Sequence, residues 1–171
     1  MFVSFDLSGV SFVIRSIVRS DLNDTYYSLL SQLSMMNMNQ ISEEKANEFY
    51  RNLSEYHKIF VIEDVANNTV IATGTIIIEQ KIIHDYGSVG HIEDMVVDTN
   101  YQKYNLGKLL VEYLTDYCLF TMKCYKCNLS CSEYNKDFYI KCGYQCHGPH
   151  ISLYKEWLSA YMIYIDVSYM K

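Results

Sequence analysis

The spacing of hydrophobic positions in the first third of the chain predicts one strand and two helices. Residues 12–17 form a short run rich in β-branched side chains, which is typical of a strand. Ser20 and Asp21 then offer a helix N-cap, and Ser42 offers a second one with two glutamates directly after it. Apolar side chains follow each cap at helical spacing: Leu22, Tyr26, Leu29, Leu30 and Leu33 after the first, and Ala46, Phe49, Tyr50 and Leu53 after the second.

The middle of the chain predicts a hairpin, and a strand–helix–strand unit follows it. Two strand-like runs, 59–63 and 70–78, are joined by a turn containing Asn67 and Asn68, because asparagine tolerates the left-handed backbone of tight turns. A loop with Gly87 and Gly90 would come next. The remaining expected elements are a strand at 91–97, a helix marked by Leu109, Leu110, Tyr113, Leu114 and Tyr117, a strand at 126–131, a short helix at 135–141 that Gly143 can end, and a last strand at 151–154.

This order, β-α-α-β-β-β-α-β-α-β, predicts an α/β protein with a mixed (α+β) sheet in a single domain of 171 residues. The strands at 91–97 and 126–131 should pair in parallel, because a crossover helix separates them. From about residue 156 the chain continues as an apolar tail whose pattern fits either a helix or a strand.

Charge and composition argue against several classes of protein. The formal net charge is −6 and no basic cluster is longer than a pair, which is atypical of nucleic-acid-binding proteins. No apolar run approaches the roughly 20 residues of a membrane span, and the first residues lack the pattern of an export signal. We therefore expect a cytoplasmic protein without nucleic-acid or membrane partners.

Six cysteines raise the alternatives of a metal site or a redox dithiol. Cys124 and Cys127 have C-x-x-C spacing. The residues between them, Tyr125 and Lys126, do not favour the turn that paired zinc ligands need, and 127–131 has the pattern of a strand. We therefore expect free thiols and no metal site among Cys118, Cys124, Cys127, Cys131, Cys142 and Cys146.

The segment 101–108 carries the clearest candidate chemistry. It lies between a predicted strand and a predicted helix, where free backbone amides and the helix dipole together attract an anion. Gly107 would let the backbone approach a ligand closely, and Lys108 would add positive charge. An ordinary loop and helix entry is the alternative interpretation.

This segment resembles the Q/R-x-x-G-x-G/A loop with which the GNAT superfamily of acetyltransferases holds the pyrophosphate of acetyl-CoA. Gln102 and Gly107 match that pattern, whereas Asn105 replaces its first glycine. Asparagine is the next best residue for a left-handed backbone, so the replacement is a mild departure. The resemblance implies the GNAT fold, with acetyl-CoA as co-substrate and no metal.

A closer resemblance is to the glucosamine-6-phosphate N-acetyltransferase family, and it covers about 12–155. It implies a homodimer that transfers an acetyl group to the 2-amino group of glucosamine 6-phosphate, in UDP-GlcNAc biosynthesis. The matching segments are Gly90-His91-Ile92-Glu93-Asp94-Met95-Val96-Val97, Leu106-Gly107-Lys108-Leu109-Leu110, Cys124-Tyr125-Lys126, Asn135, Phe138-Tyr139 and Lys141-Cys142-Gly143-Tyr144.

The same resemblance implies roles for individual residues. Glu93, Asp94 and Tyr139 would be catalytic: a carboxylate would receive the amine proton, directly or through water, and the phenol would protonate the departing thiolate. Because neighbouring strand residues face opposite sides, the two carboxylates can act as a pair only if the strand bulges. Acetyl-CoA would be bound by Met95, Val96, Val97, Gln102, Lys103, Tyr104, Asn105, Leu106, Gly107, Lys108, Asn135, Phe138 and Lys141. The amino sugar would be bound by Arg19, Ser88, His91, Glu93, Asp94, Ser130 and Lys155.

The sequence departs from the family where the sugar phosphate should bind. Ser88 and Val89 replace basic residues, and 153–155 replaces an arginine-rich strand, which leaves Arg19, Lys155, Lys81 or His84 as candidates. An alternative acceptor is therefore a peptide N-terminus, a lysine or a polyamine. A silent acyl-CoA-binding protein or a cysteine-rich metal module is a third hypothesis.

Overall fold

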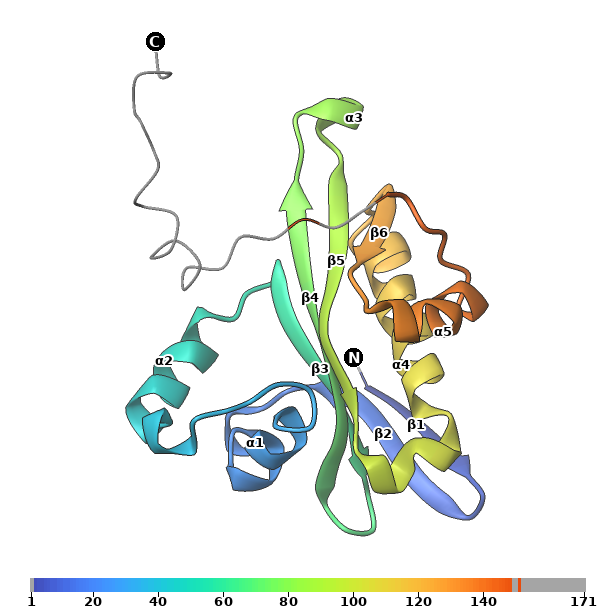
Figure 1. Cartoon of the computed structure of the whole chain (residues 1–171). Coiled ribbons are helices and arrows are strands. Elements are labelled where there is room, and N and C mark those ends of the chain that lie inside the picture. Colours follow the sequence, from blue (N-terminus) through green and yellow to red (C-terminus); the bar gives the residue numbers. More distant parts are fainter. Residues whose placement is uncertain (1, 149–150, 152–171) are drawn as a thin grey trace, which may run out of the picture.

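The chain folds around one six-stranded sheet in the computed structural model, which describes residues 2–148 and 151 (Figure 1). The strands lie across the sheet in the order of the sequence: β1 (Phe2–Leu7), β2 (Val10–Ser16), β3 (His57–Asp64), β4 (Thr69–Gln80), β5 (Ser88–Val97) and β6 (Lys126–Leu129). Neighbours from β1 to β5 are antiparallel, whereas β6 pairs with β5 in parallel. The expected mixed sheet and its parallel pair are confirmed.

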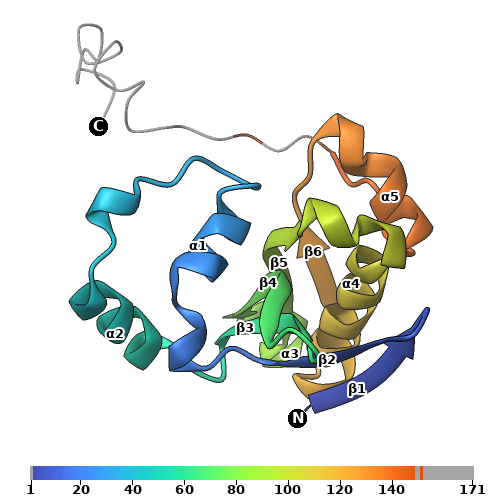
Figure 2. The same ribbon diagram turned by 90° about the horizontal axis from the view of Figure 1, so that it is seen from below.

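Helices lie on both faces of the sheet (Figures 1 and 2). α1 (Asp24–Leu30) and α2 (Glu43–Asn52) are on one side, and α4 (Leu106–Asp116) and α5 (Lys136–Lys141) are on the other. The remaining short segments are α3 (Ile83–Tyr86) at the tip of the β4–β5 hairpin, the 3-10 turns η1 (Arg19–Asp21), η2 (Met38–Gln40), η3 (Thr99–Tyr104) and η5 (Glu133–Asn135), and the π-helical η4 (Tyr117–Thr121). None of the described helices has the length and apolar character needed to cross a bilayer.

Each face of the sheet has its own core, because the side chains of a strand alternate between the two faces. On the α4 face, the predicted helical stripe contributes fully buried side chains that pack on the strands: Leu110 and Leu114 against Phe12, Ile62, Ile76 and Ile92. On the α1–α2 face, Tyr26, Leu29 and Ala46 pack with Ile59 and Val61. In all three helices the predicted stripe therefore marks the side that faces the sheet, except for Leu33, which lies beyond the end of α1 and is 46% exposed, and Phe49, which is 43% exposed.

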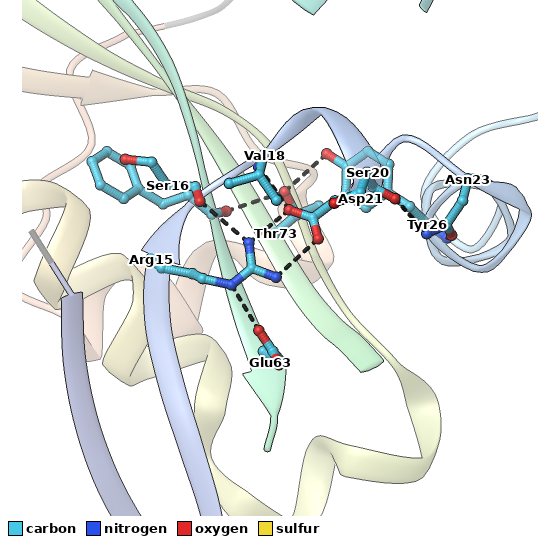
Figure 3. A network of polar contacts seen from close by, with 10 residues as sticks. Arg15, Ser16, Val18, Ser20, Asp21, Asn23, Tyr26, Glu63 and Thr73 are labelled. Carbon is cyan, nitrogen blue, oxygen red and sulfur yellow. Dashed lines mark hydrogen bonds and ion pairs between the residues drawn. The ribbon is translucent and has the colours of Figure 1, made fainter. Parts of the chain in front are cut away.

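A partly buried ionic network joins the start of the α1 layer to the sheet (Figure 3). The guanidinium of Arg15 in β2 donates two hydrogen bonds to Asp21 in η1, at 2.6 and 2.8 Å, and a third at 2.7 Å to Glu63 in β3. Asp21, only 7% exposed, also accepts the amide of Val18 at 2.7 Å. The hydrogen bonds that Arg15 donates to Asp21 raise the pKa of Arg15 above its ordinary value, although burial opposes the shift. The network orients the chain as it leaves β2 for α1.

Several local predictions hold. Ser42 caps α2 by accepting the Lys45 amide at 3.2 Å. Asn68 adopts the left-handed backbone, with φ of 48°, in the predicted β3–β4 turn. Gly143, with φ of 92°, follows α5, and the amide of Tyr144 reaches back to the carbonyl of Tyr139 at 3.1 Å, as in a Schellman end.

Other local predictions are wrong. The sequence interpretation missed β1, although the Ser8-Gly9 turn that joins it to β2 has φ of 51° and 80° and is a recognisable hairpin signal. As an edge strand, β1 buries little, so its hydrophobic pattern is weak. The N-cap of α1 is Asn23 and not Ser20, because η1 intervenes. Gly90 lies inside β5 and not in a loop. Apart from Ile151, the expected last strand and the tail from 156 lie outside the described residues.

Candidate active site

The end of β5 contains a β-bulge opposite β4. In the pairing with β4, Thr75 faces Glu93 and Thr73 faces Val96, so the single residue Gly74 stands opposite Asp94 and Met95. Asp94 takes up the extra residue with a left-handed backbone, φ of 51°. A Cβ atom on Gly74 would collide with the sulfur of Met95, so the glycine makes room for the bulged strand. The strand bulge without which Glu93 and Asp94 could not act as a pair is therefore present at these residues.

After Ile92, β5 is no longer paired with β6. The parallel pairing with β6 extends from Val89 opposite Lys126 to Ile92 opposite Leu129, where β6 ends. β5 continues to Val97, and its main-chain groups on the β6 side then have no strand partner among the described residues. A ligand with amide groups can pair with such an open strand edge.

The loop before α4 presents a second set of main-chain donors. Asn105 adopts the left-handed backbone with φ of 57° at the N-cap of α4, and its side chain does not cap the helix. The amides of the first turn of α4 therefore stay available to an anion. Lys108 lies in this turn, 3.6 Å from Glu112, and the Lys103 ammonium lies 5.1 Å from the ring centroid of Tyr104.

α5 closes the same region from the other side. A Cβ atom on Gly107 would lie 3.5 Å from Phe138 Cζ and 3.6 Å from Val97 Cγ2, so the start of α4, α5 and the end of β5 converge here. One residue along α5, the half-buried Tyr139 ring packs edge-on against Phe138. Burial raises the pKa of Tyr139, and the neighbouring Cys131 and Cys142 raise it further. The phenol is therefore protonated at neutral pH and can act as a proton donor.

The opposite face of β5 carries the polar residues expected to contact an acceptor. His91 and Glu93 lie two residues apart and share the face directed away from Ile92 and α4. His91 Nε2 lies 3.1 Å from Glu79 of β4, and Glu79 also binds Lys81. The open strand edge, the α4 loop and Tyr139 thus meet at a bulged strand whose far face carries carboxylate and imidazole groups.

Comparison with known proteins identifies this arrangement. The model of the acetyltransferase (GNAT) family matches residues 19–144. The chain belongs to the GNAT family. It is 37% identical over 147 residues to the glucosamine 6-phosphate N-acetyltransferase of Arabidopsis thaliana, a match that covers 84% of this chain and 97% of that protein. The crystal structure of the Arabidopsis enzyme superposes with a TM-score of 0.79 and covers 84% of this chain and 98% of that one.

Two more distant relatives agree with this assignment. A Dictyostelium discoideum protein of the same name is 36% identical over 148 residues, covering 85% of this chain and 91% of that protein. An acetyltransferase structure from Trypanosoma brucei has a TM-score of 0.74 at 27% identity, covering 83% of this chain and 98% of that one. The expected GNAT fold is confirmed.

Not every residue implied by the resemblance reaches the GNAT site. The hydroxyl of Ser88 donates to Cys124 Sγ at 3.5 Å, on the face opposite His91. Arg19 binds Glu43 and Asn47 beside a cavity of about 510 Å³ near α2, on the β2 side of the sheet, where β3 and β4 separate it from β5. Ser130 follows β6 directly and is exposed. Lys155 lies outside the described residues.

The six cysteines were candidates for a metal site. All six cysteines are free, with Cys118 and Cys124 buried. Among residues 2–148 and 151, no group of three or more His, Cys, Asp or Glu side chains could hold a metal ion.

The sequence interpretation missed one residue that supports the GNAT loop. Gln32, just after α1, donates to Asp98 at 3.0 Å and accepts the amide of Thr99 at 3.1 Å. Asp98 in turn accepts the amide of Asn100 at 2.8 Å. No sequence signal could have identified Gln32, since its partners are more than 60 residues away.

Proposed function

We propose that this GNAT protein transfers the acetyl group of acetyl-CoA to the 2-amino group of glucosamine 6-phosphate, producing N-acetylglucosamine 6-phosphate and CoA. The observation that carries the acetyl-transfer reaction is the bulge at Asp94 and Met95, where β5 parts from β6 beside the α4 loop. The acceptor is supported by the relatives from Arabidopsis and Dictyostelium, which are named for this reaction and are matched over at least 91% of their length.

The residues around the α4 loop fit the pyrophosphate of acetyl-CoA. Left-handed Asn105 turns the chain so that uncapped amides of α4 face outward, and Gly107 has no side chain to block them. Gln102, Lys103, Tyr104, Leu106 and Lys108 complete the loop. The open edge of β5 at 95–97 would pair with the amide groups of the pantetheine arm, and Asn135, Phe138 and Lys141 of η5 and α5 would line its other side.

Two side chains would perform the proton transfers, and a third would orient the sugar. The bound co-substrate supplies an activated acetyl thioester, whose carbonyl a main-chain amide of β5 can polarise. Glu93, on the acceptor face, would receive the proton of the attacking amine, and Asp94, exposed at the bulge, would orient the sugar. Tyr139 would donate its phenolic proton to the departing sulfur, in keeping with the raised pKa that holds it protonated.

The sugar phosphate would be bound beside the acceptor face of β5. His91 is the described candidate that shares the acceptor face with Glu93, and Lys81 lies close to it through Glu79. Lys155, Ser130 and Arg19 would contribute from other segments, Arg19 and Lys155 through a second copy of the chain. We accordingly propose a cytoplasmic homodimer in UDP-GlcNAc biosynthesis, with residues 1–171 as one N-acetyltransferase domain that ends in a tail from about 156.

The acceptor can be tested by measuring thiol release from acetyl-CoA. We expect kcat/KM for glucosamine 6-phosphate to exceed that for glucosamine by at least tenfold, because each charge-assisted contact contributes about 1.5–3 kcal/mol. Arg19→Gln should raise KM for the phosphorylated sugar and leave KM for acetyl-CoA unchanged. Equal kcat/KM for the two sugars would leave acetyl transfer standing and favour a peptide, lysine or polyamine acceptor.

A further inference from the structure

Asp64, the last residue of β3, is a buried carboxylate with four hydrogen-bond donors. It is 2% exposed. Its Oδ1 accepts the amides of Ala66 at 3.1 Å and Asn67 at 3.3 Å, and its Oδ2 accepts the Asn67 side-chain amide at 2.8 Å. The fourth donor is the hydroxyl of Tyr101, 2.8 Å from Oδ2 and 37 residues away in the sequence. Three donors therefore belong to the β3–β4 turn, and the fourth belongs to a different part of the molecule.

Tyr101 lies in the middle of η3, the segment that leads into Asn105 and α4. Its ring packs edge-on against Phe12 of β2, at 6.4 Å between centroids, and beside Tyr104 at 6.1 Å. Asp98 and Thr99, three and two residues before Tyr101, are held separately by Gln32. The loop that would bind pyrophosphate is thus fixed at its start by Gln32, just after α1, and in its middle by Asp64 at the β3–β4 turn.

The turn itself does not require Tyr101. Three donors from 66–67 occupy three of the roughly four acceptor positions of the carboxylate and close the turn. The phenol takes the remaining position on Oδ2, and this contact serves the loop. Burial by itself would raise the pKa of Asp64, but the hydrogen bonds from Asn67, Tyr101 and the turn amides outweigh it and lower the pKa. The hydrogen bond to Asp64, with burial, raises the pKa of Tyr101. The contact is therefore a phenol–carboxylate bond throughout the neutral range, and bonds of this charge-assisted kind are the stronger ones.

We propose that Asp64 is a positioning residue for acetyl-CoA, which acts through Tyr101 to hold η3 in the conformation that presents the α4 amides to the pyrophosphate. The inference rests on the acetyl-CoA role of this loop proposed above. A loop ordered during folding does not have to be ordered again on binding, so the bond should increase affinity for the co-substrate without touching it.

The test uses Tyr101→Phe in the full chain, because this change removes the hydroxyl and keeps the packed ring. We expect calorimetry to show about a tenfold weaker Kd for acetyl-CoA, the effect of losing one hydrogen bond to a charged group. KM for acetyl-CoA should rise in the same proportion, while kcat and KM for glucosamine 6-phosphate stay within twofold. In the protein without ligand, amide hydrogen exchange across 99–106 should become faster.

Tyr113→Phe is the matched control. It removes the same group from a ring on α4, and the hydroxyl of Tyr113 is buried without a hydrogen-bond partner among the described residues. We expect its Kd for acetyl-CoA and its exchange at 99–106 to equal those of the parent. Asp64→Asn puts an amide NH2 group in place of one carboxylate oxygen. With the remaining oxygen kept toward the turn amides, the NH2 group faces the phenol, so this change should weaken acetyl-CoA binding about as much as Tyr101→Phe. Combining the two changes should add little, because both act on one bond.

Two outcomes overturn the inference. If the parent binds acetyl-CoA and Tyr101→Phe binds it equally well, the inference fails and the proposed function stands. The inference also fails if Tyr101→Phe lowers kcat and raises both KM values together with a lower Tm, since that pattern indicates a general structural role. A parent that binds no acetyl-CoA overturns the proposed function as well.

Discussion

At the scale of single residues, the phenol of Tyr139 is the most direct test of the chemistry. Tyr139→Phe should lower kcat about 10²–10⁴-fold, the usual contribution of a positioned proton donor. The Kd for acetyl-CoA, measured by calorimetry, should change little, because the donated proton matters mainly in the transition state. Tyr134→Phe is the control, since Tyr134 is 94% exposed on the neighbouring η5.

The raised pKa of Tyr139 sets the sign of the pH dependence. A proton donor works below its pKa, and this pKa lies above the ordinary value of about 10. The part of kcat that depends on Tyr139 should therefore be constant from neutral pH to about pH 10 and fall above it. Turnover of Tyr139→Phe at the parent rate would withdraw the role of the phenol.

At the scale of elements, substitutions at two glycines distinguish an effect on core packing from an effect on ligand binding. A Cβ atom on Gly90 of β5 would lie 2.7 Å from Cys118 Cβ, so Gly90→Ala must push η4, which follows α4, away from the sheet. We expect it to lower the free energy of unfolding by about 1–3 kcal/mol in urea denaturation, the typical cost of overpacking. Gly107→Ala meets only ordinary contacts of at least 3.5 Å and should fold as stably as the parent.

For acetyl-CoA affinity we expect the opposite ranking: Gly107→Ala should be the more damaging of the two changes. An added methyl group at Gly107 would lie against Phe138 and Val97, where the start of α4 meets the open end of β5, and would crowd the space left for the co-substrate. Gly107→Ala should therefore weaken acetyl-CoA binding by at least tenfold. Gly90→Ala, measured well below its Tm, should bind acetyl-CoA more tightly than Gly107→Ala does. Parent-like calorimetric affinity in folded Gly107→Ala would remove the loop from the site.

At the scale of the whole molecule, the Arg15 network joins the α1–α2 layer to the sheet. Arg15→Ala would leave the buried Asp21 carboxylate without its cation, and Glu63 would lose its partner. Removing one member of a fully buried ion pair typically costs roughly 3–5 kcal/mol. Because Arg15 keeps 22% of its side chain exposed and Glu63 keeps 15%, we expect a smaller loss in unfolding free energy, about 2–3 kcal/mol. Arg51→Ala, at an exposed position of α2, should stay within about 0.5 kcal/mol of the parent. A loss below 1 kcal/mol for Arg15→Ala would contradict a structural role for the network.

Local signals in the sequence determined much of this protein. The stripe that includes Leu110 and Leu114, the cap at Ser42 and the left-handed residues Asn68 and Asn105 all depend on neighbours within a few positions. Helical period, cap chemistry and turn preference are properties of short segments, so the sequence predicts them without knowledge of the fold. The family motif built on those segments correctly indicated the GNAT fold.

The tertiary structure alone decided which distant groups meet. The bulge at Asp94 depends on Gly74 of the facing strand, and the bond between Tyr101 and Asp64 spans 37 residues. The register of β5 turned Ser88 toward Cys124 and away from the acceptor face, and the position of η1 brought Arg19 to Glu43. A polar side chain takes the partner that long-range packing places beside it, and nothing in its own sequence neighbourhood specifies that partner.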